Sequence, residues 1–119
     1  ARQYKKMDQV NATTRAKDFE LMVTVQKALS EYQGTQSDLA LANARLDMAK
    51  IQDEQSEYRH RTGQVDFDRF MNDRNDFFEA RLRQLNETGR RELALLNLKH
   101  LAGDLQSQFV DVASWEKEN

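Results

Sequence analysis

The sequence predicts an all-α fold, a long antiparallel helical hairpin of coiled-coil-like character. Three observations lead to this prediction. The 119 residues include no proline and only four glycines, so little in the chain interrupts a helix. Alanine, leucine, glutamate, glutamine, arginine and lysine, which are good helix formers, are abundant. Apolar and small residues recur at steps of three and four positions on both sides of Gly63.

Residues 1–62 are predicted to form one long helix, with or without a kink near Gly34. Its apolar stripe steps through Met22, Val25, Leu29, Tyr32, Leu39, Ala42, Leu46 and Ala49. An alternative interpretation places a turn at Gly34, with Ser37 and Asp38 capping a new helix. The continuation of the stripe across Gly34 favours the single helix.

Gly63 is predicted to end this helix, because the stripe loses its phase there. Residues 63–66 form the predicted tip turn, and Asp66 or Asp68 caps a second helix over residues 67–102. Gly103 is a natural residue to follow a helix end. Residues 103–119 are predicted as a short helix or an irregular tail, since their apolar spacing fits either. The predicted apolar face of the second helix comprises Phe67, Phe70, Met71, Phe77, Phe78, Leu82, Leu85, Leu93, Leu96 and Leu101.

Two long helices that share one short turn must pack antiparallel. The small residues predicted to face the phenylalanine-rich start of the second helix are Ala40, Ala42, Ala44 and Ala49. The apolar face of the second helix is wider than a two-helix contact requires, and a lone hairpin would leave much of it in water. We therefore expect further helices, from other subunits, to complete a bundle or tube.

Composition and charge exclude several classes of function. The formal net charge is −2 with acids and bases interspersed, unlike the basic face of a nucleic-acid binder. The chain has no cysteine, and His60 and His100 lie forty residues apart, so we expect no metal site and no cofactor. No Ser/His/Asp or Cys/His set can be assembled, so we expect no catalytic residue and no enzyme. No run of about 18 apolar residues is present.

Residues 38–105 carry a pattern that points to a family. An alanine-rich helix over residues 39–46 leads into residues 60–73, which contain Gly63, and a leucine-alanine-glycine sequence ends the pattern at Gly103. In this order and spacing the chain resembles the TolC-like outer-membrane efflux proteins, or outer membrane factors. Their helices end in a Tyr-x-x-Gly-x-x-x-x-x-Asp-Val-Leu-x-Ala pattern, and His60 stands here at the tyrosine position.

The resemblance implies roles for the turn and for the start of the second helix. In the family, the corresponding turn is the periplasmic tip of a helical duct, and it contacts a periplasmic adaptor, or membrane fusion, protein. The implied adaptor-contacting residues are Thr62, Gly63, Gln64 and Val65. The implied residues lining the constriction of the duct are Arg69, Asn72 and Asp73.

The resemblance also implies partners and a compartment. The hairpin would be the periplasmic, non-catalytic part of a bacterial outer-membrane export or efflux channel, of the kind that serves type I secretion. It would self-associate as a homo-oligomer, a trimer in the intact channel, and bind the adaptor. It would reach the membrane only through a β-barrel that this stretch of sequence lacks. Because the chain begins at Ala1 and not at methionine, we expect a mature product or an excised fragment.

A generic coiled-coil module for protein–protein interaction is the alternative function. Spectrin-like, chaperone-like and scaffold hairpins carry apolar stripes of the same spacing, so the stripes fit them as well as a channel. The two hypotheses differ in the compartment and in the partner that they predict.

Overall fold

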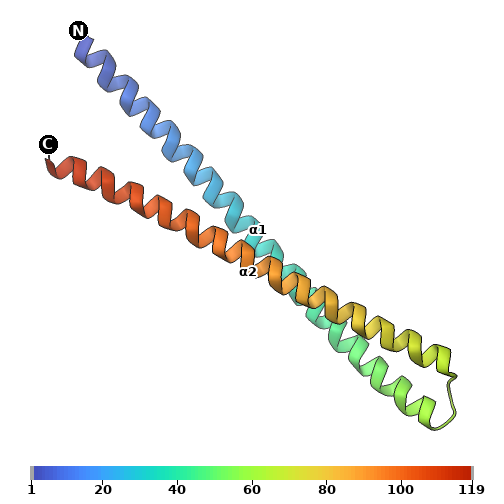
Figure 1. Cartoon of the computed structure of the whole chain (residues 1–119). Coiled ribbons are helices and arrows are strands. Elements are labelled where there is room, and N and C mark those ends of the chain that lie inside the picture. The colour runs from blue at the N-terminus through green and yellow to red at the C-terminus, as the bar shows by residue number, and fades with distance from the viewer. Residues whose placement is uncertain (1, 119) are drawn as a thin grey trace. The chain divides into compact units, whose positions relative to one another are not determined.

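The computed structural model describes the backbone of residues 2–118 and the side chains of residues 10–107. Helix α1, Arg2–Arg61, and helix α2, Phe67–Glu118, are joined by the turn at residues 62–66 (Figure 1). No strand occurs within residues 2–118. The fold is all-α, and the prediction of an antiparallel helical hairpin is confirmed.

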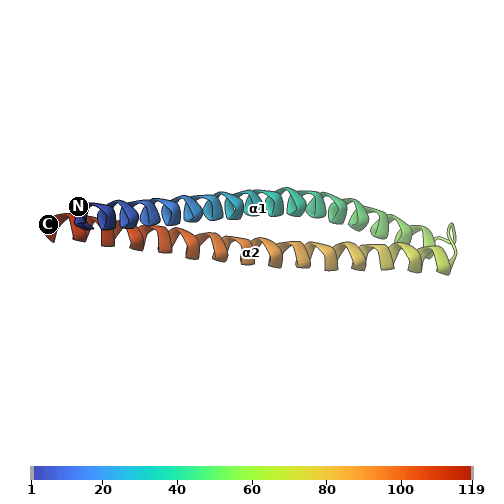
Figure 2. The same cartoon turned by 90° about the horizontal axis from the view of Figure 1, so that it is seen from above.

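The chain divides into two compact units. The tip unit, Gln33–Leu93, contains the turn and the adjoining parts of both helices. The terminal unit comprises Ala1–Tyr32 and Ala94–Asn119. Figures 1 and 2 both show α1 and α2 side by side in the tip unit. The residues of interest for function lie in this unit.

Helix α1 runs through Gly34 without a break. Ser37 and Asp38, the alternative cap, lie within the helix and do not begin a new one. Thr35 is buried and lies one helical turn from half-buried Leu39, so the contact face of the helix continues past the glycine. Burial along this continued face stabilises the helix at Gly34, where a glycine on its own would favour a turn.

Helix α2 does not end at Ala102, which corrects the predicted helix boundary. It continues through Gly103 to Glu118. Leu98, Leu101 and Leu105 are half-buried at steps of three and four residues, so the same face stays covered on both sides of the glycine. A glycine inside a helix costs about 1 kcal/mol relative to alanine, and continued burial of neighbouring leucines offsets that cost.

The two helices of the tip unit meet along a seam of buried and half-buried side chains. The seam residues of α1 are Thr35, Leu39, Ala42, Leu46, Ala49, Asp53, Ser56 and His60. The seam residues of α2 are Phe70, Asp73, Phe77, Ala80, Gln84, Glu87 and Arg91. Both sets alternate steps of three and four residues, which is the repeat of about 3.5 residues that coiled coils use.

The seam is polar for a protein interior. Its buried apolar residues are Ala42 and Leu46, whereas Thr35, Asp53 and Ser56 are also buried. Contacts between polar side chains therefore help to set which residues lie opposite each other. Gln84 Nε2 donates a hydrogen bond to Asn43 Oδ1 at 2.9 Å beside the seam.

Many of the larger apolar side chains of the tip unit lie outside the seam. The α1 outer stripe consists of Leu41, Ala44, Met48, Ile51, Gln55 and Tyr58, all exposed. The α2 outer stripe consists of Phe78, Leu82, Leu85, Gly89 and Leu93, all exposed. Met48 is 72% exposed and Leu82 is 61% exposed. At about 100° per residue, each outer stripe lies almost opposite the seam on its own helix.

The apolar face predicted for the second helix is only partly covered, as expected for a lone hairpin. Phe70 and Phe77 are half-buried in the seam, but the residues Phe67, Phe78, Leu82, Leu85, Leu93 and Leu96 are exposed. Of the alanines predicted to face the second helix, Ala42 and Ala49 do lie in the seam, whereas Ala40 and Ala44 are exposed. Helical spacing identifies an apolar face, but it does not identify which neighbour covers that face.

Candidate functional site

Helix α1 ends in a Schellman motif at the tip. Gln64 N–H donates to the carbonyl of Arg59 at 2.7 Å, and Gly63 N–H donates to the carbonyl of His60 at 3.1 Å. Gly63 has φ = 74°, a left-handed conformation in which any Cβ is strained. Arg59, His60 and Arg61 place basic groups in the last turn, where they complement the negative end of the helix. The turn is thus closed by its own backbone.

Helix α2 begins with Asp66 as its N-cap. The Oδ1 atom of Asp66 accepts a hydrogen bond from Arg69 N–H at 2.9 Å, and its carbonyl accepts one from Phe70 N–H at 3.2 Å. Of the two capping candidates in the sequence, Asp66 is the cap. Asp68 lies in the first turn, where a negative charge favours the positive end of the helix.

The predicted adaptor-contacting residues differ in their exposure. Thr62, Gly63 and Gln64 are exposed, and Val65 is half-buried. The Thr62 hydroxyl donates to the carbonyl of Tyr58 at 3.1 Å, which ties this side chain to the end of α1. The side chain of Gln64 is therefore the one most available to a partner at the tip.

A groove of about 370 Å³ lies beside the turn. Its lining residues are Met48, Ile51, Gln52, Gln55, Ser56, Arg59, Val65, Arg69 and Asp73. The groove brings together Val65, from the predicted tip set, and Arg69 and Asp73, from the predicted constriction set. Asn72 does not line this groove and is exposed. Val65, Arg69 and Asp73 thus line one groove, and Asn72 does not.

The groove offers apolar and cationic groups to a partner. Asp73 Oδ1 accepts a hydrogen bond from Gln52 Nε2 at 3.2 Å, so this carboxylate already has a neighbour. The buried Oγ of Ser56 has no hydrogen-bond partner among the described residues. Arg59 and Arg69 line the groove from α1 and α2 respectively. These groups suit protein contact at the side of the tip.

A polar and aromatic cluster next to the turn joins the two helices. Arg74 donates to Asp53 through Nε to Oδ1 at 3.1 Å and through Nη2 to Oδ2 at 3.3 Å, and Nη2 lies 3.5 Å from Glu57 Oε2. The Arg74 guanidinium also lies over the Phe70 ring, 4.8 Å from its centroid. The His60 and Phe70 rings stack with centroids 5.0 Å apart. The cluster therefore fastens the helices close to the tip.

The hydrogen bond from Arg74 to Asp53 raises the pKa of Arg74, a shift that burial partly opposes and that the charges of Asp53 and Glu57 increase further. The sequence pattern alone singles out neither Arg74 nor Asp53. A signal was present, because Asp53 follows Ala49 and precedes Ser56 in the seam repeat. A carboxylate at such a position requires a partner.

Neither metal coordination nor membrane crossing finds support in the described part of the chain. Within it, no three His, Cys, Asp or Glu side chains gather as metal ligands would. Neither helix holds, among its described residues, an apolar stretch of the length that a membrane crossing needs. The candidate site is therefore the tip, with its closed turn and the adjoining groove. No protein-family model, curated protein or solved structure matches the chain.

Proposed function

We propose that this chain is the periplasmic, non-catalytic helical portion of a bacterial outer-membrane export or efflux channel, similar to the TolC-like proteins. The observation that carries the proposal is the exposure of apolar side chains along the outer faces of both helices, such as Met48 and Leu82. A helix in the wall of a duct has a neighbour on each side and needs two contact faces. The seam supplies one face of each helix in the tip unit, and the outer stripe supplies the other.

In this proposal the turn at Gly63 contacts a periplasmic adaptor. The Schellman motif and the Asp66 cap fix the backbone of the turn, which presents Gln64 in one defined position. Preorganised contact residues lose less conformational entropy on binding than mobile ones. The groove that contains Val65 adds a lateral surface for the same partner.

The proposed constriction residues differ in their surroundings. Arg69 and Asp73 line the groove beside the turn, and Asp73 accepts a hydrogen bond from Gln52. Asn72 is exposed and lies outside the groove. Asn72 is therefore the best placed of the three to face the lumen of a duct.

An export assay in the bacterium that encodes the chain tests this function. Deleting the gene should abolish export through its system, and the tip variants Gln64→Arg and Val65→Asp should reproduce much of that loss at unchanged protein levels. Lys50→Gln serves as the control, because Lys50 is exposed and lies outside the seam, the outer stripe and the groove. Normal export by both tip variants would contradict the proposed adaptor contact.

A coiled-coil module that connects other proteins is the second candidate function. The seam repeat and its polar pair Asp53–Arg74 favour it, because coiled coils in many compartments use a buried polar pair to define register. Cell fractionation separates the two candidates. Recovery of the chain with the cell envelope supports the channel, and recovery from the cytoplasm supports the module.

A further inference from the structure

We propose that the groove beside the turn is a binding site for a small amphiphilic carboxylate. Arg59 and Arg69 hold the carboxylate, and Met48 and Ile51 cover the apolar body of the ligand. The inference goes beyond the proposed function and does not rest on it, because it needs neither an adaptor nor a second copy of the chain. The groove measures about 370 Å³, a volume within the range of small-molecule sites.

Arg59 and Arg69 bring two positive charges to the groove from different helices. Neither guanidinium forms an ion pair or a hydrogen bond with any residue whose side chain the structure describes. Glu57, two positions before Arg59, is held instead by Arg61 at 2.8 Å and by Arg74 at 3.5 Å. Unpaired guanidinium groups in a groove favour an anionic ligand, and each can donate two hydrogen bonds to a carboxylate.

Asp73 is the acidic residue among the described residues that line the groove. Its Oδ1 atom accepts a hydrogen bond from Gln52 Nε2 at 3.2 Å. Two arginines against one aspartate leave the groove positive, although the formal net charge of the chain is −2. The negative charge of Asp73 repels a second anionic group, so the groove favours a ligand with one carboxylate over a ligand with two.

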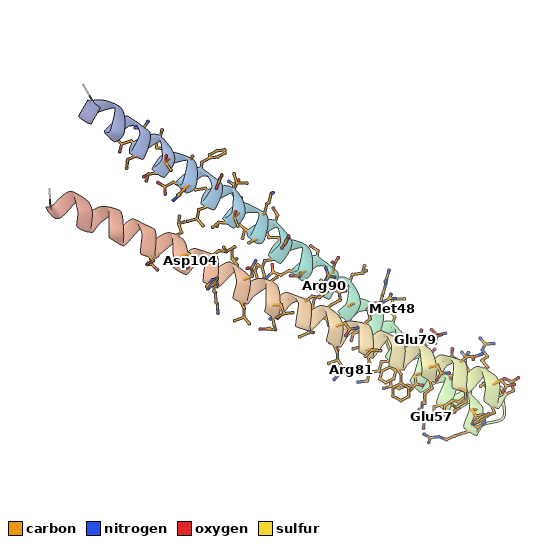
Figure 3. The ribbon with its side chains drawn as sticks, turned by 45° about the horizontal axis from the view of Figure 1, so that its top comes forward. Met48, Glu57, Glu79, Arg81, Arg90 and Asp104 are labelled. Atoms are coloured by element: carbon orange, nitrogen blue, oxygen red, sulfur yellow. The ribbon has the colours of Figure 1, made fainter. Side chains whose placement is uncertain are left out.

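Two apolar side chains, Met48 and Ile51, line the groove on the side away from the turn. Met48 precedes Arg59 by about three helical turns, and Figure 3 shows Met48 farther from the turn than Glu57. Met48 is 72% exposed and Ile51 is 55% exposed. Covering these side chains removes apolar surface from water, which favours a ligand with a hydrocarbon body over a bare anion.

Contacts between the helices fix the two walls of the groove before a ligand binds. The hydrogen bond from Gln52 to Asp73 joins α1 to α2 within the groove lining. The next residue on each helix continues the connection, because Arg74 donates to Asp53 at 3.1 Å and 3.3 Å. A site whose walls are already held in place loses less conformational entropy on binding than a mobile one.

An NMR titration of the full 119-residue chain with octanoate tests the site. Octanoate should bind saturably, with the largest amide shifts at the residues that line the groove. Arg59→Gln and Arg69→Gln should each weaken binding about fivefold or more, since each removes charge-assisted hydrogen bonds. Arg61→Gln is the matched control, because it removes the same charge close to the turn but outside the groove. Its affinity should stay within about twofold of the parent, and unchanged circular dichroism shows that each variant keeps its helices.

Changes in the ligand and at Asp73 test the proposed chemistry separately. Asp73→Asn should tighten octanoate binding about two- to threefold, because it removes a like charge and keeps an oxygen for Gln52. Acetate, which has no apolar body, should bind at least about tenfold more weakly than octanoate. Octylamine, which carries a positive charge, should not compete with octanoate.

Four results would overturn the inference. They are the absence of saturable octanoate binding below about 10 mM, acetate binding as tight as that of octanoate, displacement of octanoate by octylamine, and weaker octanoate binding by Asp73→Asn. Each of them contradicts the site itself or one of the groups assigned to its ligand.

The two tip variants separate this site from the adaptor contact. Gln64 does not line the groove, so Gln64→Arg should bind octanoate at least as tightly as the parent chain. Val65 lines the groove, so Val65→Asp adds a repelling carboxylate and should weaken binding about fivefold. Octanoate binding by the parent chain together with normal export by both variants leaves the site intact and removes the adaptor role. Lost export without octanoate binding by the parent chain removes the site and leaves the adaptor role.

Discussion

Arg74 and Asp53 form a two-point ion pair between the helices, with Nε 3.1 Å from Oδ1 and Nη2 3.3 Å from Oδ2. The two residues are 21 positions apart in the chain, on opposite sides of the turn. The Asp53 side chain is 11% exposed and the Arg74 side chain 33% exposed, so water screens the pair only in part. The pair fixes the register of the hairpin near the tip.

Replacing Asp53 with alanine should destabilise the hairpin, because the only carboxylate left near Arg74 would be Glu57, at the longer distance of 3.5 Å. In a double-mutant cycle, the double variant Asp53→Ala with Arg74→Ala should lose less free energy of unfolding than the two single variants lose in sum. Urea unfolding followed by circular dichroism measures each stability. Arg83→Ala, a change at an exposed residue without an ion pair among the described residues, is the control. Strictly additive losses would show that the pair does not couple the helices.

The pH dependence of this contact follows from the raised pKa of Arg74. A base whose pKa is higher in the folded state contributes stability that is fully present below its unfolded pKa and is lost as the pH rises through the folded pKa. The Arg74 contribution should therefore stay constant from neutral pH up to the ordinary pKa of arginine. Comparing Arg74→Ala with the parent chain at pH 7 and pH 10 checks this, and a difference in stability that shrinks between these values would contradict it.

Gly63→Ala and Gly34→Ala should change the free energy of unfolding in opposite directions. Gly63→Ala should lower the free energy of unfolding by about 1 kcal/mol, because the residue must hold a left-handed φ of 74°. Gly34→Ala should raise it by about 1 kcal/mol, because Gly34 is helical. An added Cβ meets nothing within 4 Å at either position, so contact does not complicate the comparison. If both variants were less stable than the parent chain, or both more stable, the left-handed Gly63 of the Schellman motif would be contradicted.

Removing the cap of α2 should cost about 1 kcal/mol. Asp66→Ala deletes the acceptor for Arg69 N–H, which lies 2.9 Å from Oδ1. Asp66→Asn keeps an oxygen at the same position and should retain most of the stability. Thermal unfolding of the two variants measures the difference. An alanine variant as stable as the asparagine variant would show that the cap does not hold the start of the helix.

Two leucines with different exposure should respond differently to truncation. Leu46 is 9% exposed in the seam, and Leu46→Ala should lower the stability by about 2 kcal/mol at any protein concentration. Leu82 is 61% exposed, and Leu82→Ala should change the stability of the dilute monomer by less than about 0.5 kcal/mol. Its effect should appear as weaker self-association at high concentration. A large loss in the dilute Leu82→Ala chain would place this residue in the intramolecular contact.

The hairpin itself was predictable from a few local features. The absence of proline, the steps of three and four residues and the loss of phase at Gly63 identify two helices and their turn. The end of α2 was not predictable from Gly103, because a glycine is tolerated inside a helix where the leucines around it remain packed. The local sequence predicts how much a glycine destabilises the helix, but it does not predict the tertiary contacts that offset this destabilisation.

The helical spacing alone does not predict which face of each helix meets the other helix, nor which residues pair at the tip. Phe77 and Phe78 are adjacent in the sequence, yet Phe77 lies in the seam and Phe78 on the outer stripe. Deciding between them needs the register of the opposite helix, to which side-chain pairs such as Asp53–Arg74 contribute. The resemblance predicts the tip residues, but the groove that unites Val65 with Arg69 depends on how the chain folds back.

Cross-linking from the tip in living cells tests the central claim most directly. In cells that produce the chain, Gln64→Cys introduces a single thiol at the exposed end of the hairpin, since the sequence has none. After treatment with a thiol-specific bifunctional reagent, mass spectrometry identifies what is attached. The proposed function predicts a periplasmic adaptor protein, captured through Gln64→Cys and not through the control Lys50→Cys. Adducts with cytoplasmic proteins alone would contradict it.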